Sequence, residues 1–278
     1  MSPLQEPTGR QKTRRRRTIY ASTFVAAAVT ATTLLGASPA SADQPWDGLQ
    51  GWGGDEFSGS TLDPARWDTK RDCCGEINGG FQEKGPSPAG PNPNRSVSGG
   101  YLRLSSDYGG ATPTGAYVEE RSGRAADGDT TDMRCFPASA GGCAWAMRWK
   151  ADPAAAGTWQ GAYVYGRDDV TELNTHEVDP SLAPDGSAVQ ATHIWGDTSK
   201  EPSPNWQIVP INRGDWNISG IRIAADGTVT RYMNGTARAG GKVDPQQGYH
   251  LSIGTVPHGP GSTAATQLVD WVREYRGR

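Results

Sequence analysis

Short runs of alternating apolar and polar residues, separated by turn signals, are the feature that most constrains the fold of this chain. The runs occupy residues 97–104, 144–149, 221–223 and 229–232. A period of two residues is typical of a strand with one buried face. The turn signals are Asp-Gly or Asn-Gly pairs within 127–128, 184–186, 226–227 and 234–235. Because no helical period extends over more than about two turns, the pattern predicts an all-β chain.

The composition agrees with many short strands. The chain has 37 Gly, 20 Pro and 10 Trp, which makes it rich in turns and aromatic side chains. Residues 221–224 and 228–233, joined through Asp226-Gly227, are predicted to form a β-hairpin. The Gly/Pro-rich stretch 75–94 is predicted to be a long surface loop, since too few residues precede it to build a separate domain. A sandwich or jelly roll is the expected class.

The N-terminus has the three regions of a secretory signal. A basic stretch at 10–17 is followed by an uncharged run at 18–35 and by small residues that end at Ala42. We therefore expect residues 1–42 to be removed and 43–278 to form one secreted, extracellular domain with no remaining membrane segment. A permanent membrane helix is the weaker alternative, because no stop-transfer flank follows the run. The pair Arg16-Arg17 leaves the general and twin-arginine export routes both open.

Charge and cysteine content narrow the possible partners and covalent links of the chain. The net charge is −3, and no basic stripe lies in the mature part, so nucleic acid is not an expected partner. Four cysteines in an exported chain predict disulfides. Cys135 and Cys143 are close enough in sequence to bridge, whereas the adjacent Cys73 and Cys74 would strain their shared peptide. All three pairings of four cysteines remain open, and no CxxC spacing indicates zinc.

The segment 171–178 carries the sharpest chemical signal. In a regular strand Glu172 and Asn174 point to one face, and Glu177 points to the other. A one-residue bulge near Thr175 or His176 would return Glu177 to the first face. His176 would then lie either beside a cleft or on the opposite face. The bulged strand would present Glu, Asn and Glu in a row.

Two carboxylates in such a row suit retaining glycoside hydrolysis. One attacks the anomeric carbon while the second, about 5 Å away, protonates the leaving oxygen and later activates water. The pair needs unequal protonation, which neighbouring charge and hydrogen bonds impose. Asn174 can donate a hydrogen bond to either Glu. The alternative is a solvated polar strand face, the usual role of such segments.

Four further segments resemble one family. They are 55–67 (DEFSGSTLDPARW), 157–162 (GTWQGA), 191–196 (ATHIWG) and 268–275 (LVDWVREY). Together with the Glu-rich strand they resemble the family 16 glycoside hydrolases, the β-glucanase and laminarinase group. The resemblance covers nearly the whole mature chain. It implies a concanavalin A-like jelly-roll sandwich of two curved antiparallel sheets and a retaining endo-acting hydrolase of a β-linked polysaccharide.

The same resemblance assigns the catalytic roles. Glu172 would be the nucleophile, Glu177 the acid/base, and Asn174 would occupy the helper position where the family has Asp. Asn keeps the size and hydrogen bonding of Asp but lacks its charge, so activity would be weaker or its pH range moved. A second frame beginning at Glu177 lacks a second Glu, and Pro180 would end the strand, so Asp179 is expected at the strand end.

Binding residues follow from the resemblance as well. Trp159 and Trp195 would be platforms for sugar rings, and His193 would line the cleft. A structural calcium would be held at Glu56, the Gly100 carbonyl and Asp270, while catalysis itself would need no cofactor. Two further tryptophans, Trp145 and Trp149, alternate as core positions do.

The main competing function is a non-catalytic glycan-binding protein, which Asn174 favours. A structural cell-surface protein is a weaker alternative, because the sequence shows no anchor or repeat that would support it. We expect a monomer whose partner is its polysaccharide substrate. The sequence does not distinguish β-1,3-glucan, mixed-linkage glucan and galactans, because cleft loops determine that choice.

Overall fold

The computed structural model describes a defined part of the chain, all within the compact unit Ala40–Arg278. The described residues are 44, 46–68, 82–83, 94–106, 114–120, 134–152, 155–167, 170–180, 182–194, 199, 206–257 and 262–278. The predicted signal at 1–42, the Asp127-Gly128 turn, Cys73, Cys74, Trp195 and most of the predicted 75–94 loop lie outside them. No helix among the described residues is long and apolar enough to cross a membrane.

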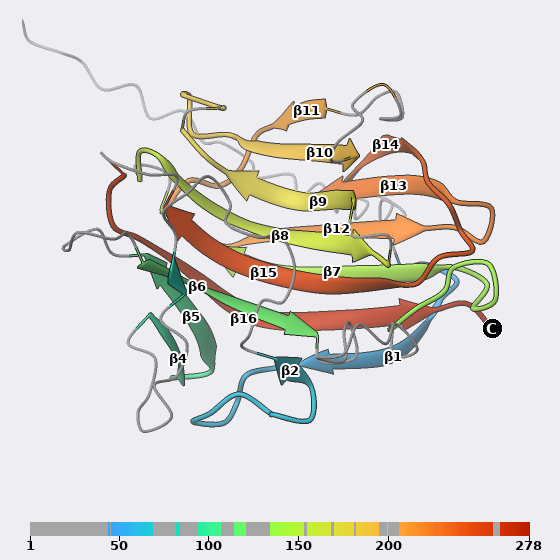
Figure 1. Cartoon of the computed structure of the whole chain (residues 1–278), viewed down its shortest axis with the longest axis horizontal. Coiled ribbons are helices and arrows are strands. Elements are labelled where there is room, and N and C mark those ends of the chain that lie inside the picture. The colour runs from blue at the N-terminus through green and yellow to red at the C-terminus, as the bar shows by residue number, and fades with distance from the viewer. Residues whose placement is uncertain are drawn as a thin grey trace, which may run out of the picture. The chain divides into compact units, whose positions relative to one another are not determined.

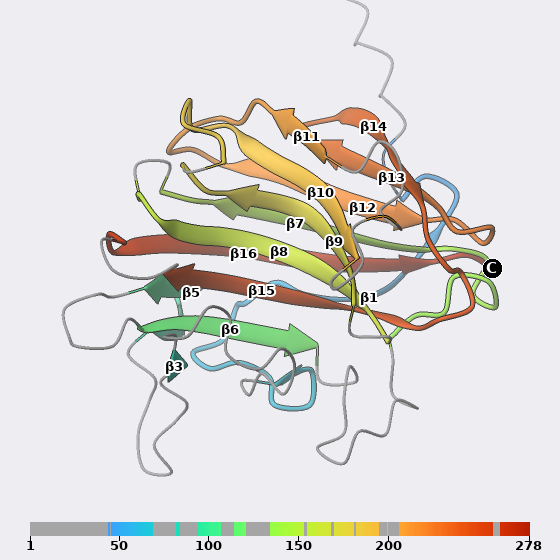
Figure 2. The same cartoon turned by 45° about the horizontal axis from the view of Figure 1, so that its top comes forward.

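Two eight-stranded sheets stack as separate layers (Figures 1 and 2). The first sheet has the order β14 (Thr236–Lys242), β13 (Thr228–Met233), β12 (Asn217–Ile223), β7 (Cys143–Lys150), β16 (Ala265–Arg276), β5 (Tyr101–Ser106) and β4 (Arg95–Ser98), with β1 (Gln50–Asp55) on β16. The second has the order β11 (Trp206–Val209), β10 (Ala188–Ile194), β9 (Thr171–Val178), β8 (Thr158–Gly166), β15 (Tyr249–Pro257), β6 (Thr114–Glu120) and β2 (Trp67–Asp68), with β3 (Gln82–Glu83) on β6. All described pairings are antiparallel except β3 with β6. The predicted all-β jelly-roll sandwich is confirmed.

The core lies between the sheets and follows the predicted alternation. In β7 the inward side chains include Trp145 and Trp149, which are buried as expected from their positions. Leu173 of β9 and Leu251 of β15 join the same apolar cluster from the second sheet. Burying each such side chain contributes about 1.5 to 3 kcal/mol to stability. The sandwich therefore fixes which face of each strand is left for a site.

The turn chemistry gave one correct and one wrong strand prediction. The hairpin β12–β13 forms, with Gly227 at φ 85°, where a side chain would be strained. A single strand over 97–104 is wrong: β4 ends at Ser98, and Gly99 and Gly100 turn the chain into β5. Both glycines have positive φ, 64° and 83°, so two Gly at the centre of an alternating run indicate a tight hairpin.

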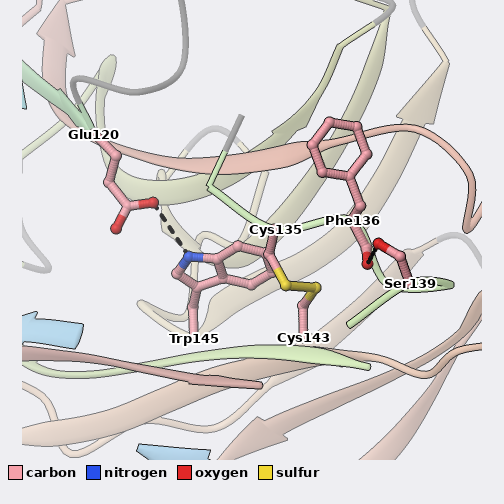
Figure 3. Close-up of a disulfide and its surroundings, with 6 residues drawn as sticks. All are labelled: Glu120, Cys135, Phe136, Ser139, Cys143 and Trp145. Atoms are coloured by element: carbon pink, nitrogen blue, oxygen red, sulfur yellow. Dashed lines mark hydrogen bonds between the residues drawn. A yellow bond between two sulfur atoms is a disulfide. The ribbon is translucent and has the colours of Figure 1, made fainter. Parts of the chain in front are cut away.

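A disulfide joins the two sheets at one end of the interior strands β7 and β15 (Figure 3). Cys143 is the first residue of β7, and Cys135 exchanges backbone hydrogen bonds with Tyr249 of β15. Beside it, the buried Trp145 donates its indole N–H to the Glu120 carboxylate at 3.2 Å. One of the pairings left open by sequence is therefore formed, and it connects strands of opposite layers.

Removing this bridge is expected to destabilise the sandwich without abolishing the fold. The double change Cys135→Ser and Cys143→Ser frees a loop with a sequence separation of 8. Loop-closure entropy for so short a loop predicts a loss of about 2 to 3 kcal/mol in the free energy of unfolding. Urea unfolding of the variant and of the reduced wild type measures it. Equal midpoints for variant and oxidised wild type would contradict the expectation.

Candidate functional site

A β-bulge interrupts β9 at the predicted place. Along β8, Ala162 pairs with His176 and the next residue, Tyr163, pairs with Asn174, so Thr175 has no counterpart. The pairing with β10 shifts across the same stretch. The extra residue reverses the alternation of everything after it. The predicted bulge is therefore confirmed.

The bulge puts the two glutamates on one face. Leu173 and Val178 both belong to the core between the sheets, although they are five positions apart and a regular strand would turn them to opposite faces. Glu172, Asn174 and Glu177 consequently share the other face, the one turned away from the first sheet. All three side chains are buried there.

Polar contacts fix the bulge from both neighbouring strands. The Thr175 hydroxyl donates to the Ala162 carbonyl of β8 at 3.1 Å. From β10, Gln190 Nε2 donates to the Thr175 carbonyl at 2.7 Å and to the Tyr232 carbonyl of the first sheet at 3.0 Å. The position of the extra residue is therefore set by side chains as well as by strand register.

His176 anchors the bulge to the opposite sheet and is not a cleft residue. Its ring stacks on Trp149 with centroids 3.8 Å apart. Gln267 Nε2 lies 2.9 Å from its Nε2, and Ser219 Oγ lies 2.8 Å from its Nδ1. An amide nitrogen can only donate, so Nε2 accepts and Nδ1 carries the proton toward Ser219. Burial lowers the pKa of His176 well below 6.5, which keeps the ring neutral.

The environment of Glu177 favours the protonated form of its carboxyl group. Burial, and then the charges of Glu172 and Asp179, raise its pKa from 4.5 to about 8. Asn174 acts in the opposite direction: its Nδ2 donates to Glu177 Oε2 at 2.5 Å, which favours the ionised form. Burial and like charges outweigh this bond. The carboxyl assigned to the acid/base role is therefore protonated at neutral pH.

A row of polar and aromatic side chains crosses the strands through Glu172. Register places Tyr165 of β8 on one side of Glu172 and His193 of β10 on the other. Beyond Tyr165, His250 of β15 lies opposite it with the rings 6.0 Å apart. His250 Nε2 is 3.1 Å from Glu119 Oε1 of β6. Neighbouring strands are about 4.8 Å apart, so the row has the spacing of successive sugar units in an extended chain.

The predicted binding residues have different outcomes. His193 lies on this face, and Trp159 lies on β8 directly before Gln160, which pairs with Val178. Trp195 is outside the described residues. Sequence analysis missed Trp206, which is 40% exposed at the start of β11 with its ring 6.1 Å from His193. An exposed Trp beside a polar strand face is the signal that could have found it.

Gly161 makes room for Tyr163 next to Glu177. Gly161 pairs directly with Glu177. A Cβ at Gly161 would lie 2.6 Å from the Tyr163 hydroxyl and 2.9 Å from the His176 carbonyl, both closer than side-chain contacts allow. The Tyr163 ring therefore folds over Gly161 toward Glu177, so that a phenol is positioned beside the carboxyl.

Gly161→Ala is expected to displace Tyr163 and to lower kcat/KM by roughly 10- to 100-fold, because misplacement by about 1 Å at a reacting centre has this effect. Steady-state kinetics on a β-glucan, the substrate class that the sequence resemblance implies, measure it. Gly51→Ala is the matched control, since nothing lies within 4 Å of a Cβ built there. Wild-type kinetics in the Gly161 variant would show that Tyr163 has no part in the site.

The three positions that the resemblance assigns to calcium lie near one another, because the registers of β1 and β5 on β16 continue to Glu56 and Gly100 at the stretch around Asp270. Glu56 Oε1 accepts from Arg273 Nε at 3.1 Å, and Asp270 is paired with Arg148. Gly100 lies in the β4–β5 turn. The described residues contain no group of three His, Cys, Asp or Glu side chains suited to a metal. Arginines pair with both carboxylates in this structure, and calcium stays a prediction of the resemblance alone.

Comparison with solved structures identifies the fold. A laminarinase from Flavobacterium sp. UMI-01 superposes with a TM-score of 0.60 at 13% identity, over 81% of this chain and 100% of that one. A non-specific endo-β-1,3(4)-glucanase from family GH16 gives a TM-score of 0.61 at 15% identity, over 84% and 92%. The sandwich expected from the sequence resemblance is the fold of these glucanases.

A third similar structure shows that this fold does not by itself determine activity. A pseudo β-1,3-glucanase and immunostimulatory antigen of Mycobacterium tuberculosis gives a TM-score of 0.58 at 17% identity, over 83% of this chain and 100% of that one. No protein-family model matches the sequence, and comparison with curated proteins finds no significant match. The function therefore has to be argued from the residues of the site.

Proposed function

We propose that this chain is a secreted, retaining endo-acting glycoside hydrolase of a β-linked polysaccharide, with β-1,3-glucan or mixed-linkage glucan favoured and a galactan as the alternative. One observation carries the proposal. The bulge at Thr175 puts Glu172 and Glu177 on the same face, with Asn174 between them and bonded to Glu177. The fold, which the chain shares with glucan-cleaving enzymes, supports the proposal.

The proposed mechanism uses both carboxylates in turn. Glu172 attacks the anomeric carbon as the glycosidic C–O bond breaks, and Glu177 gives its proton to the departing sugar oxygen. This leaves a glycosyl ester on Glu172 and an ionised Glu177. Glu177 then takes a proton from water as the water oxygen attacks the same carbon, which releases Glu172 and a sugar of retained configuration.

The electrostatics support this division of roles. A general acid must hold its proton at the working pH, and the pKa of Glu177, about 8, provides that. Once Glu172 is esterified, its negative charge is gone, and with it one of the causes that raise the pKa of Glu177. Glu177 is then a carboxylate ready to act as a base.

The row across the strands supports a polymer substrate. Its aromatic and polar members extend from Glu119 on β6 to Trp206 on β11, on both sides of Glu172. A row that continues on both sides of the nucleophile suits cleavage within a chain. Several consecutive sugar units can contact the row, and aromatic rings suit the flat C–H faces of the sugars.

The test is a polysaccharide panel assayed for new reducing ends with the mature chain, comprising laminarin, barley mixed-linkage glucan, agarose and carrageenan. We expect release from one or both glucans, and NMR of the first products should show the β anomer. Inverted products would overturn the retaining mechanism. No release from any member, with glucan binding retained, would instead support the glycan-binding alternative that Asn174 favours.

Secretion is part of the proposal and has its own test. The signal at 1–42 predicts export and a mature N-terminus at Asp43. N-terminal sequencing of the protein from culture medium checks the cut. Gel filtration of the same material checks the expected monomer.

A further inference from the structure

Asp179 occupies an unusual place beside the acid/base. It is the first residue after β9, which ends at Val178, and it is fully buried. Its backbone carbonyl accepts hydrogen bonds from the N–H groups of Leu182 and Ala183, at 3.0 and 2.9 Å. This turn fixes the backbone of the residue at the end of the strand.

Asp179 continues the row of the catalytic strand. Val178 points into the core, so its two neighbours, Glu177 and Asp179, both turn to the opposite face. Gln160 of β8 pairs with Val178, and continuing this register puts Asp179 across from Trp159. Two residues along a strand span about 7 Å. The Asp179 carboxyl therefore lies next to the acid/base on the side away from Glu172.

We propose that Asp179 supplies the negative charge that Asn174 lacks, and so is the positioning residue that keeps the catalytic proton on Glu177. The inference rests on the proposed function and deepens it. The helper charge has moved from the centre of the motif to the end of the strand, where it acts on Glu177 from the other side.

The opposing hydrogen bond explains why such a charge is needed. Asn174 Nδ2 donates to Glu177 Oε2, and a donated bond favours the carboxylate. Asp179 raises the pKa of Glu177 and thus offsets that bond. A like charge this close to a buried carboxyl raises its pKa, and so helps to decide whether the acid stays protonated at neutral pH.

Apart from Tyr163, which lies beside Glu177, the other titratable groups on this face lie farther along the sheet. On β9 itself, Glu172 faces Glu177, and Asn174 is neutral. The titratable side chains that the neighbouring strands turn to this face are Tyr163, Tyr165, His193, His250 and Glu119. Of these, His250 and Glu119 are paired with each other two and three strands away. Among the described residues, Glu172 and Asp179 are thus the carboxylates nearest to Glu177.

The test is the pH profile of kcat/KM for Asp179→Asn on the glucan that the wild type cleaves. The basic limb reports loss of the proton from the acid in the free enzyme. We expect the limb to move to lower pH by about one unit, and the double variant Asn174→Asp with Asp179→Asn to return it toward the wild-type position. Asp185→Asn is the matched control, because the Asp185 carboxylate is exposed and accepts hydrogen bonds from Ser187 in the following turn.

A purely structural Asp179 would give a different pattern. Asp179→Asn would then lower the melting temperature, leave the basic limb unmoved and gain nothing from Asn174→Asp, which would overturn the proposal. Asp179→Glu and Asp179→Gln form a second pair that differs only in charge, for use where Asp179→Asn does not fold. Within this pair, only the Gln variant should show the shifted limb.

A measurement without substrate separates this inference from the proposed function. The difference in melting temperature between the chain with Glu177 and the chain with Glu177→Gln, followed against pH, reports proton binding by Glu177. Asp179→Asn should move that transition to lower pH even where no glucan is cleaved. An unmoved transition overturns the role of Asp179, whereas an inactive wild type overturns only the hydrolase.

Discussion

Replacing Glu172 with Gln is expected to abolish glucan hydrolysis, with kcat lowered by roughly 10,000-fold or more. Gln has the shape of Glu but carries no negative charge, so it cannot form the ester with the anomeric carbon. The bulge, the pairing with Tyr165 and His193, and the core contact of Leu173 are independent of that charge. The variant should therefore fold and still bind glucan.

Three measurements decide this prediction. Reducing-end release gives kcat, thermal unfolding shows whether the fold persists, and calorimetry with laminarin shows whether binding persists. Glu56→Gln makes the same chemical change at a mostly exposed side chain that pairs with Arg273 and should keep wild-type activity. Residual hydrolysis above about a tenth of wild type would exclude Glu172 as the nucleophile, since no second nucleophile replaces it in the proposed mechanism.

The bulge could be predicted because two observations point to it independently. Leu173 and Val178 are both apolar but five positions apart, which one regular strand cannot bury on one face. Glu172 and Glu177 have the same odd separation. A single inserted residue resolves both conflicts, and the hydrogen bonds of Thr175 and Gln190 show how it is held. Local sequence therefore predicted the central geometry of the site.

The role of His176 could not be predicted from its neighbours. The ring is polar enough for a cleft and flat enough to stack in a core. Its partners Trp149, Ser219 and Gln267 come from three strands of the other sheet. Packing of one layer on the other decides which face it takes, and that packing depends on residues remote in sequence.

The rest of the row was missed for a similar reason. Glu119 and His250 are 131 residues apart and meet because β6 and β15 are adjacent. Asp179 was expected at the strand end, and it lies there. Its significance comes from full burial beside Glu177, which a single sequence does not display. Strand order and burial, unlike strand periodicity, are properties of the assembled sandwich.

Glu177→Gln is expected to separate activity from stability. Loss of the acid should lower kcat on glucan by roughly 100- to 10,000-fold, because the leaving oxygen then departs without a proton. The same change should stabilise the fold at alkaline pH. Gln can occupy the buried position as a neutral group, and its side-chain oxygen can still accept the hydrogen bond from Asn174.

The pH dependence follows from the raised pKa. Folded Glu177 holds its proton up to about pH 8, whereas the unfolded chain releases it near 4.5. The folded state thus binds more protons in this window, and the contribution of Glu177 to the free energy of unfolding falls as pH rises through it. Relative to wild type, Glu177→Gln should therefore gain about 2 to 4 kcal/mol between pH 5 and pH 8. The difference should level off above pH 8.

Urea unfolding of both proteins at several pH values measures this gain, and Glu56→Gln controls for the loss of a glutamate charge that is mostly exposed. A constant difference from pH 5 to pH 8 would mean that Glu177 is ionised throughout, as a solvated strand residue would be. The acid role would then fail together with the stability prediction, because both depend on the same proton. A gain that rises with pH, accompanied by lost hydrolysis, would show that the site keeps an unfavourable buried carboxyl for its chemistry.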